Sequence, residues 1–257
     1  MKTCIFTIVL NGMPTLPTIF FTLQSTKLDW HWYIIEGAAN NTHCTAWCRQ
    51  QLPGLSEDGT SQFLKMIETH PRVTVIQREM WDGKVDMCNA ALEQIKIPCI
   101  LMQMDADELW RADILERFID YFSEDGNANR AAIKCRYFLG VNIVSTKDGT
   151  YGNNHGEWLR AWKFSPGDKF DRHEPPQLIQ SHKGHLMNPA WLKMDGIFFD
   201  HYAWAFENQV GYKEQFYGYP NALENWRKLQ ANTLWPIKSL KEFLPWVGEG
   251  AGADRLV

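Results

Sequence analysis

The sequence lacks the features that would place it in several large classes of protein. No apolar run approaches the length needed to cross a bilayer, and the short apolar start ends at 11–14 (Asn-Gly-Met-Pro) without a small-residue cleavage site. The six cysteines show no disulfide-like framework. The formal net charge of −4 indicates no basic surface for nucleic acid. We therefore expect a cytoplasmic protein with reduced thiols, no transmembrane segment and no nucleic-acid partner.

The sequence also lacks the two common loops that cradle phosphates. No glycine-rich dinucleotide fingerprint follows the first expected strand, and Gly83-Lys84 has no upstream glycine at the spacing of a P-loop. No internal repeat is visible. A nucleotide bound by this chain would have to be held by other means, of which a metal ion is one.

What is present is the pattern of one substantial α/β domain, with 257 residues of which 45% are hydrophobic. Short β-branched or apolar runs alternate with amphipathic segments through the first half, which predicts a mostly parallel central sheet flanked by helices. The expected strands are 4–10, 30–36, 72–76 and 99–104, and the expected helices are 17–27, 61–69, 84–96 and 113–122. Residues 38–59 have no clear period and are expected to form a loop insertion.

The second half changes character. Runs at 131–139, 141–146 and 158–164 are separated by turn residues and predict a mixed-strand extension, followed by helices near 206–217 and 223–230. We expect a single domain over 1–234, in which residues 1–110 and 111–234 form two halves. Residues 235–257 contain two prolines and a glycine-rich end, which is typical of a loosely held tail.

The most informative stretch is Asp105-Ala106-Asp107-Glu108, which follows an apolar strand directly. In an extended chain residues i and i+2 point the same way, so Asp105 and Asp107 would converge and repel each other unless a cation lay between them. Mg²⁺ or Mn²⁺ suits such oxygen ligands and shares its remaining positions with phosphate oxygens. The alternative is a helix start, with Asp107 as N-cap and Glu108 in the first turn.

Several polar residues follow other strands of the same expected sheet. Ligands of parallel α/β sheets bind beyond the carboxyl ends of the strands. Residues at or just past those ends should share one rim, and they are Asn11, Gly12, Glu36, Met80, Trp81 and the acidic stretch 105–108. This geometry favours the metal site over the helix start.

A family resemblance is carried by an ordered set of segments between about residue 3 and about residue 230. The chain resembles the GT-A glycosyltransferases, and most of all their family 2. The segments are Thr7 to Gly12, Ile34-Ile35-Glu36, Trp81-Asp82-Gly83-Lys84 with Asn89 to Leu92, Met104 to Leu109 with its Asp-x-Asp pattern, Leu159 to Phe164, Arg172-His173-Glu174 and Asp200-His201-Tyr202. The second strand departs from the pattern, because it ends in Glu-Gly-Ala where the family usually has Asp-Asp-Gly.

The resemblance implies a GT-A-like (Rossmann-like) nucleotide-diphospho-sugar transferase fold. It also implies a glycosyltransferase that uses Mn²⁺ or Mg²⁺ and a nucleoside-diphosphate sugar, with a UDP-sugar favoured, and that transfers the sugar with inversion to a glycan or other saccharide acceptor. The nucleotide-sugar donor would contact Leu10, Asn11, Glu36, Lys84, Asp105 and His173. The metal ligands would be Asp105, Asp107 and His201. Lys84 could instead be a solvated lysine in the first turn of a helix. Glu36 could instead be an ordinary acidic residue of a turn.

The acceptor hydroxyl needs a general base, and the resemblance places it in the second half of the chain. Glu174 is the first candidate and Asp195 the reserve. Glu174 lies before two prolines, so an ordinary loop acid is the alternative, and His201 could equally be a core histidine. Trp81, Trp110 and Trp158 are candidate sugar-stacking surfaces, although most tryptophans lie in cores. His43, Cys44 and Cys48 look only loosely zinc-like, because no second ligand pair follows at standard spacing.

Two other functions compete with sugar transfer. A sugar-nucleotide nucleotidyltransferase has a similar sheet and acidic metal site, but usually an early glycine-rich, basic loop that residues 11–27 lack. A catalytically inactive carbohydrate-binding protein would not need the acid pair and Glu174.

Overall fold

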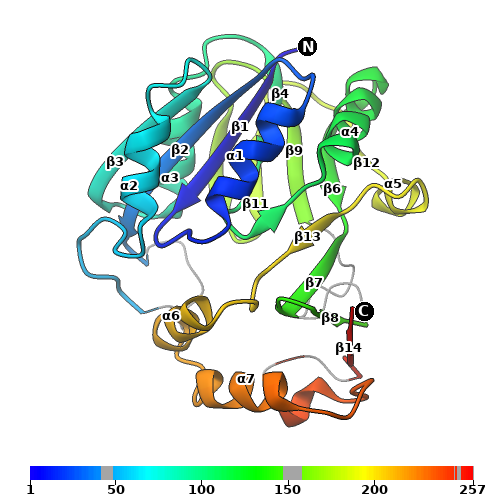
Figure 1. Cartoon of the computed structure of the whole chain (residues 1–257). Helices are drawn as coiled ribbons and strands as arrows, with labels where there is room; N and C mark the ends of the chain where they lie inside the picture. The colour runs from blue at the N-terminus through cyan, green and yellow to red at the C-terminus, as the bar shows by residue number, and fades with distance from the viewer. Residues whose placement is uncertain (42–48, 147–157, 246, 248–249, 257) are drawn as a thin grey trace.

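The computed structural model describes residues 1–41, 49–146, 158–245, 247 and 250–256. A seven-stranded sheet with the order β12-β6-β9-β4-β1-β2-β3 runs through the molecule (Figure 1). Its parallel part consists of β1 (Thr3–Val9), β2 (Trp30–Ala39), β3 (Val73–Trp81) and β4 (Cys99–Gln103). Only β9 (Trp158–Phe164) runs antiparallel to its neighbours, β4 and β6 (Ala128–Ile133). The predicted α/β fold with a mostly parallel central sheet is confirmed.

Both faces of the sheet are covered because its strands carry apolar residues on both sides. In β1, Ile5 packs with α1 (Leu16–Ser25), α2 (Thr60–Ile67) and α4 (Ala112–Glu124). Its neighbours Cys4 and Phe6 pack on the other face with α3 (Lys84–Leu92) and the hairpin of β10 (Lys169–His173) and β11 (Pro176–Ile179). Alternate residues of one strand thus enter different hydrophobic clusters, as the two-residue period of a strand requires.

A second sheet has the order β14-β8-β7-β13-β5. It is mixed, because β13 (Phe199–His201) pairs parallel with β7 (Cys135–Gly140) and antiparallel with β5 (Glu108–Leu109). The expected mixed extension is therefore present, built from strands that the periodicity only partly predicted. Two short elements complete this half: β12 (His185–Met187) at the edge of the large sheet and α5 (Pro189–Met194).

Two helices lie beyond the carboxyl ends of the parallel strands, namely α6 (Glu207–Tyr217) and α7 (Ala222–Ala231) (Figure 1). The chain after them was expected to be held loosely, and this expectation is wrong. Ile237, Leu240 and Leu244 are buried in the larger hydrophobic cluster, and β14 (Ala253–Arg255) pairs with β8 (Ile143–Ser145). Apolar residues spaced among the prolines explain the packing. Within the described ranges, no helix combines the length and the apolar character that a membrane span requires.

Candidate active site

A cavity of about 650 Å³ opens at the carboxyl ends of β1, β2 and β4, the rim expected from the topology. The turn after β1, the turn after β4, the tip of the β10–β11 hairpin, the first residue of α3 and one side of α6 line it. Its size falls within the range of small-molecule sites. Elements far apart in the sequence therefore contribute side chains to one space.

The turn after β1 is hydrogen-bonded to the loop that precedes α2 and to the first residue of that helix. The backbone N–H groups of Asn11 and Gly12 donate to Ser56 Oγ (2.9 Å) and Thr60 Oγ1 (2.8 Å). Asn11 has a φ of +61°, which asparagine tolerates better than most residues. Leu10 and Asn11 both line the cavity, where the resemblance placed them.

Glu36 does not line the cavity, although it was expected to contact the nucleotide. Its side chain is fully buried, and its carboxylate accepts hydrogen bonds from Ser56 N (3.1 Å), Ser61 Oγ and Gln77 Nε2 (2.6 Å). These bonds occupy the carboxylate within the protein and connect β2 to the loop before α2. The sequence pattern placed the end of this strand at Glu36, but β2 continues to Ala39. The pattern also could not show that protein donors use this acid.

Asp105 belongs to a buried network. Strand β4 ends at Gln103, so Asp105 and Asp107 lie in a turn and not in extended chain. One oxygen of Asp105 accepts from Gln103 Nε2 (2.9 Å) and the other from Arg160 Nη2 (2.8 Å). Burial raises the pKa of Asp105, but Arg160, His173 and the hydrogen bond from Gln103 together outweigh it, and the pKa lies below its usual range.

Arg160 is the centre of that network. Its guanidinium also donates to both carboxylate oxygens of Glu108, at 2.6 to 2.9 Å. The side chains of Arg160 and Glu108 are 2% and 0% exposed. A fully buried carboxylate, Glu108, and a partly exposed one, Asp105, thus share one buried cation. Both oxygens of Asp105 already accept hydrogen bonds from protein groups. That Asp105 and Asp107 share one cation stays a prediction.

Asp107 faces a different set of partners, contributed by β13 and α6. Its carboxylate accepts from Gln209 Nε2 (2.9 Å) and lies 3.4 Å from His201 Nε2 and 3.5 Å from Lys213 Nζ. Burial favours the neutral acid, but His201 and Lys213 outweigh it and hold the pKa of Asp107 well below its usual range. Asp107 is therefore ionised at neutral pH, and like His201 and Lys213 it lines the cavity.

The third acid of the cavity is Glu174, at the tip of the β10–β11 hairpin. Its Oε1 pairs with Lys84 Nζ at the start of α3 and lies 3.8 Å from His173 Nδ1. Burial opposes ionisation, yet His173 and Lys84 outweigh it and lower the pKa of Glu174 to about 2. Burial also lowers the pKa of His173, whose Nε2 lies 3.3 Å from Gln103 Nε2. The structure thus brings Lys84, His173 and Glu174 together on one wall of the cavity.

Asp195 is not part of this site. It follows α5, is exposed to solvent, and its backbone carbonyl accepts from Arg117. It does not line the cavity. Its role as the reserve base is therefore not supported, since a base must come within reach of the acceptor hydroxyl.

The candidate stacking tryptophans serve the core instead. Trp81 is fully buried, and its Nε1 donates to the Glu36 carbonyl (2.9 Å). Trp110 is 4% exposed and stacks on Phe199. The side chain of Trp158 and residues His43, Cys44 and Cys48 lie outside the described residues.

Sequence reasoning missed the contribution of α6. Gln209 and Lys213 are four residues apart, so they share one face of the helix. This spacing, shortly after the Asp-His-Tyr segment, was the sequence signal that could have indicated their part in the site. Aromatic side chains from α6 and its neighbours form much of the remaining wall; they are Tyr137, Trp204, Phe206, Tyr212, Phe216, Tyr217 and Tyr219. Such a surface suits a ring-shaped ligand.

A divalent cation has fewer protein ligands here than the acidic stretch suggested. Among the described residues, no three His, Cys, Asp or Glu side chains lie close enough together to hold a metal ion. The Asp107 carboxylate and the His201 imidazole lie next to each other, and both are metal-binding groups. These two residues would supply two protein ligands to a divalent cation. Oxygens of a bound diphosphate would have to complete the coordination.

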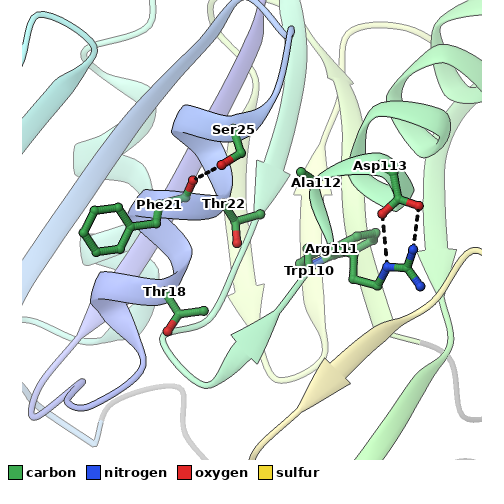
Figure 2. A pocket seen from close by; sticks show the side chains of 8 residues that line it. All are labelled: Thr18, Phe21, Thr22, Ser25, Trp110, Arg111, Ala112 and Asp113. Carbon is green, nitrogen blue, oxygen red and sulfur yellow. Dashed lines mark hydrogen bonds and ion pairs between the residues drawn. The ribbon is translucent and has the colours of Figure 1, made fainter.

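A second depression, of about 510 Å³, lies between α1 and the start of α4 (Figure 2). Its charged residues, Arg111 and Asp113, pair with each other at 2.8 Å. The Phe21 ring points away from that pair, and Ser25 Oγ donates to the Phe21 carbonyl (2.8 Å). Because Arg111 and Asp113 neutralise each other, this surface offers a ligand less charge than the first cavity.

The model of the glycosyl transferase family 2 matches residues 54–178. No curated protein sequence matches the chain. Among solved structures, S. aureus TarS 1–349 is 15% identical with a TM-score of 0.44, over 63% of this chain and 47% of that one. The same protein in complex with UDP-GlcNAc gives 15% and 0.42, over 59% and 38%. The mannosyltransferase PcManGT from Pyrobaculum calidifontis, in complex with GDP-Man and Mn²⁺, gives 17% and 0.41, over 63% and 44%.

The chain therefore spans less than half the length of each of these solved structures. Because the identities and TM-scores are low, the function proposed below rests on the family match and on the cavity. The family match and the mostly parallel, helix-flanked sheet together confirm the predicted resemblance: the chain has a GT-A-like fold and resembles glycosyltransferase family 2.

Proposed function

We propose that this chain, with its GT-A-like fold and its resemblance to glycosyltransferase family 2, transfers a sugar from a nucleoside-diphosphate sugar, preferably a UDP-sugar, to a hydroxyl group of a glycan or other saccharide. The observation that carries the proposal is the cavity at the sheet rim. Two carboxylates with depressed pKa values, Asp107 and Glu174, face it from opposite elements, each beside a lysine.

The donor's diphosphate would lie where these lysines can reach it. Lys84 and Lys213 both line the cavity. Lys84 interacts electrostatically with Glu174, and Lys213 with Asp107. Positive groups placed in advance around a leaving diphosphate stabilise the charge that develops as the glycosidic bond breaks. The turn at Leu10 and Asn11 would support the nucleoside, since it borders the same space.

A divalent ion, Mn²⁺ or Mg²⁺, would be held by Asp107 with His201 as its second protein ligand. When bound, it supplies Lewis-acid stabilisation to the departing diphosphate. Asp105 would act indirectly, because Arg160 and Gln103 fix its carboxylate and with it the turn that carries Asp107. This differs from the sequence prediction, in which Asp105 was itself a metal ligand.

Glu174 would be the general base that accepts the proton of the acceptor hydroxyl. With a pKa of about 2, it is ionised but a weak base while Lys84 is bound to it. A diphosphate would compete for the Lys84 ammonium, and loss of that partner would raise the pKa of Glu174 towards its ordinary value. One base without a protein nucleophile is what a single displacement with inversion needs, so inversion is the outcome we propose.

The test is nucleotide release from a panel of UDP-, GDP- and TDP-sugars with a saccharide acceptor, with and without Mn²⁺. We expect release of the nucleoside diphosphate by the wild type and at least about a hundredfold slower release by Asp107→Asn. Release of pyrophosphate from a nucleoside triphosphate and a sugar phosphate would instead indicate a nucleotidyltransferase. Saccharide binding without turnover of any donor would indicate an inactive binding protein.

A further inference from the structure

The ammonium group of Lys213 lies beside Asp107, and both side chains line the cavity. Nζ lies 3.5 Å from Asp107 Oδ2 and donates to the backbone carbonyl of Ala203. It also lies 5.5 Å from the centre of the Trp204 ring. The side chain is 18% exposed, so it reaches the site from α6 with little contact with bulk water. This group is a cation already in place beside the carboxylate proposed to hold a metal.

The surroundings of Lys213 would allow its ammonium group to move away from Asp107. Burial lowers the pKa of Lys213, and Asp107 opposes this effect. The Asp107 contact is longer than a hydrogen bond, whereas Gln209 makes a 2.9 Å bond to the same oxygen. Within α6, only the side chains of Val210 and Phe216 are buried. The Lys213 side chain has four flexible methylene groups and can reorient without moving the helix.

We infer that Lys213 is a protein-borne counter-cation of the site, which neutralises Asp107 in the free protein, competes with a divalent cation for it, and reaches the diphosphate once it has been displaced. Only the last part, contact between Lys213 and the diphosphate, rests on the proposed function. Lys213 lies at Asp107 Oδ2 and His201 at Oδ1. Competition for Asp107 follows from electrostatics, because an ammonium group and a divalent ion beside the same carboxylate repel each other. No bond is made or broken in this exchange.

The test compares the wild type with Lys213→Met, Lys213→Arg and Lys228→Met. Lys228 is an exposed lysine of α7 that pairs with Glu224, and its replacement is the matched control for loss of one positive charge. Mn²⁺ affinity is measured by the electron paramagnetic resonance of free Mn²⁺ without nucleotide. UDP affinity is measured by calorimetry in EDTA. Thermal unfolding shows whether each variant is folded, and Lys213→Gln replaces Lys213→Met if the latter is not.

We expect Lys213→Met to bind Mn²⁺ about tenfold more tightly than the wild type, because the competing cation is gone. Lys213→Arg and Lys228→Met should stay within about twofold of the wild type. In EDTA, Lys213→Met should bind UDP about tenfold more weakly, and Lys213→Arg should retain most of the affinity. The gain in Mn²⁺ affinity should vanish when Asp107→Asn is added, since the exchange requires that carboxylate.

Unchanged or weaker Mn²⁺ binding by folded Lys213→Met would overturn the inference, and so would an equal gain in Lys228→Met. The proposed function fails in a different way: if the wild type binds no nucleoside diphosphate with or without Mn²⁺, the donor assignment is wrong, while the Mn²⁺ measurements without nucleotide still decide the competition at Asp107.

Discussion

The two walls of the cavity use their charged residues in opposite ways. On the sheet wall, Asp105, Glu108 and Arg160 bind one another, and the Arg160 and Glu108 side chains are almost completely buried. On the facing wall, which we define as α6 together with the tip of the β10–β11 hairpin, Lys213 and Glu174 are 18% and 24% exposed and line the cavity. Arg160 and Glu108 therefore support the fold. Asp105, which is 28% exposed and lines the cavity, and the residues of the facing wall remain within reach of a ligand.

This difference predicts which substitutions unfold the protein and which change only its chemistry. A buried charge that loses its partner destabilises the folded state strongly, whereas a partly exposed charge can be replaced at little cost. Substitutions on the sheet wall should thus act first on stability, and substitutions on the facing wall should act first on binding or rate.

The largest effect is expected from Arg160→Met. It leaves Glu108, whose side chain is 0% exposed, without its cation, and should lower the free energy of unfolding by about 3–5 kcal/mol. Urea denaturation measures the change. The matched control is Arg136→Met, which breaks a bidentate pair with Asp200 whose side chains are 44% and 21% exposed, at a cost of about 1 kcal/mol or less. Equal losses in the two variants would show that burial does not make the Arg160 network more important to the fold than an exposed ion pair.

Glu174→Gln should have the next largest effect, and its main effect should be on rate. Removal of the base should slow sugar transfer about a hundredfold at saturating substrates, with UDP affinity nearly unchanged. Initial-rate kinetics and calorimetry separate the two quantities. A variant with full activity would remove Glu174 from the mechanism. A variant that no longer folds would place it with the sheet wall.

The pH dependence of stability provides a finer comparison. The pKa of Glu174 falls from an ordinary 4.5 to about 2 in the folded protein, so its ionised form stabilises the fold. That contribution is fully present above the unfolded-state pKa and is lost as the pH falls from about 4.5 towards 2. The stability difference between the wild type and Glu174→Gln should therefore shrink over this range. The exposed Glu93, replaced by Gln, serves as control, and an equal trend there would contradict the assignment.

The smallest effect is expected from Gln209→Ala. It removes one neutral hydrogen bond to Asp107, so the free energy of unfolding should change by about 1 kcal/mol or less. Mn²⁺ affinity should change by no more than about fivefold, because His201 and the carboxylate remain. A loss as large as that of Asp107→Asn would mean that Gln209, and not the charge of Asp107, organises this wall.

The same contrast explains how much the sequence could predict. The parallel strands and their helices followed from alternating apolar patterns, and their carboxyl ends placed Asn11, Gly12 and Asp107 at one rim. Local pattern cannot show which partner an acid finds through the fold. Glu36 and Asp105 were therefore predicted as ligand contacts, although Ser56, Ser61 and Gln77 bind the first and Arg160 the second.

The facing wall was the less predictable of the two. Helix α6 itself was expected, but its side facing Asp107 depends on how β13 pairs with β5 and β7, which is a contact between distant segments. Lys213 could not be assigned to the site without that pairing. The C-terminal segment was misjudged for a related reason, because prolines and glycines suggested a loose end while Ile237 and Leu240 pack into the core.

The central claim is that a nucleoside-diphosphate sugar binds between the two walls with its cation at Asp107. Crystals soaked with UDP-sugar and Mn²⁺ test it most directly through the anomalous scattering of manganese. The account predicts a single peak within about 2.2 Å of an Asp107 oxygen, with the diphosphate beside it and the Asp105–Arg160 contact intact. A peak bound to Asp105 with Arg160 displaced, or a nucleotide outside this cavity, would contradict it.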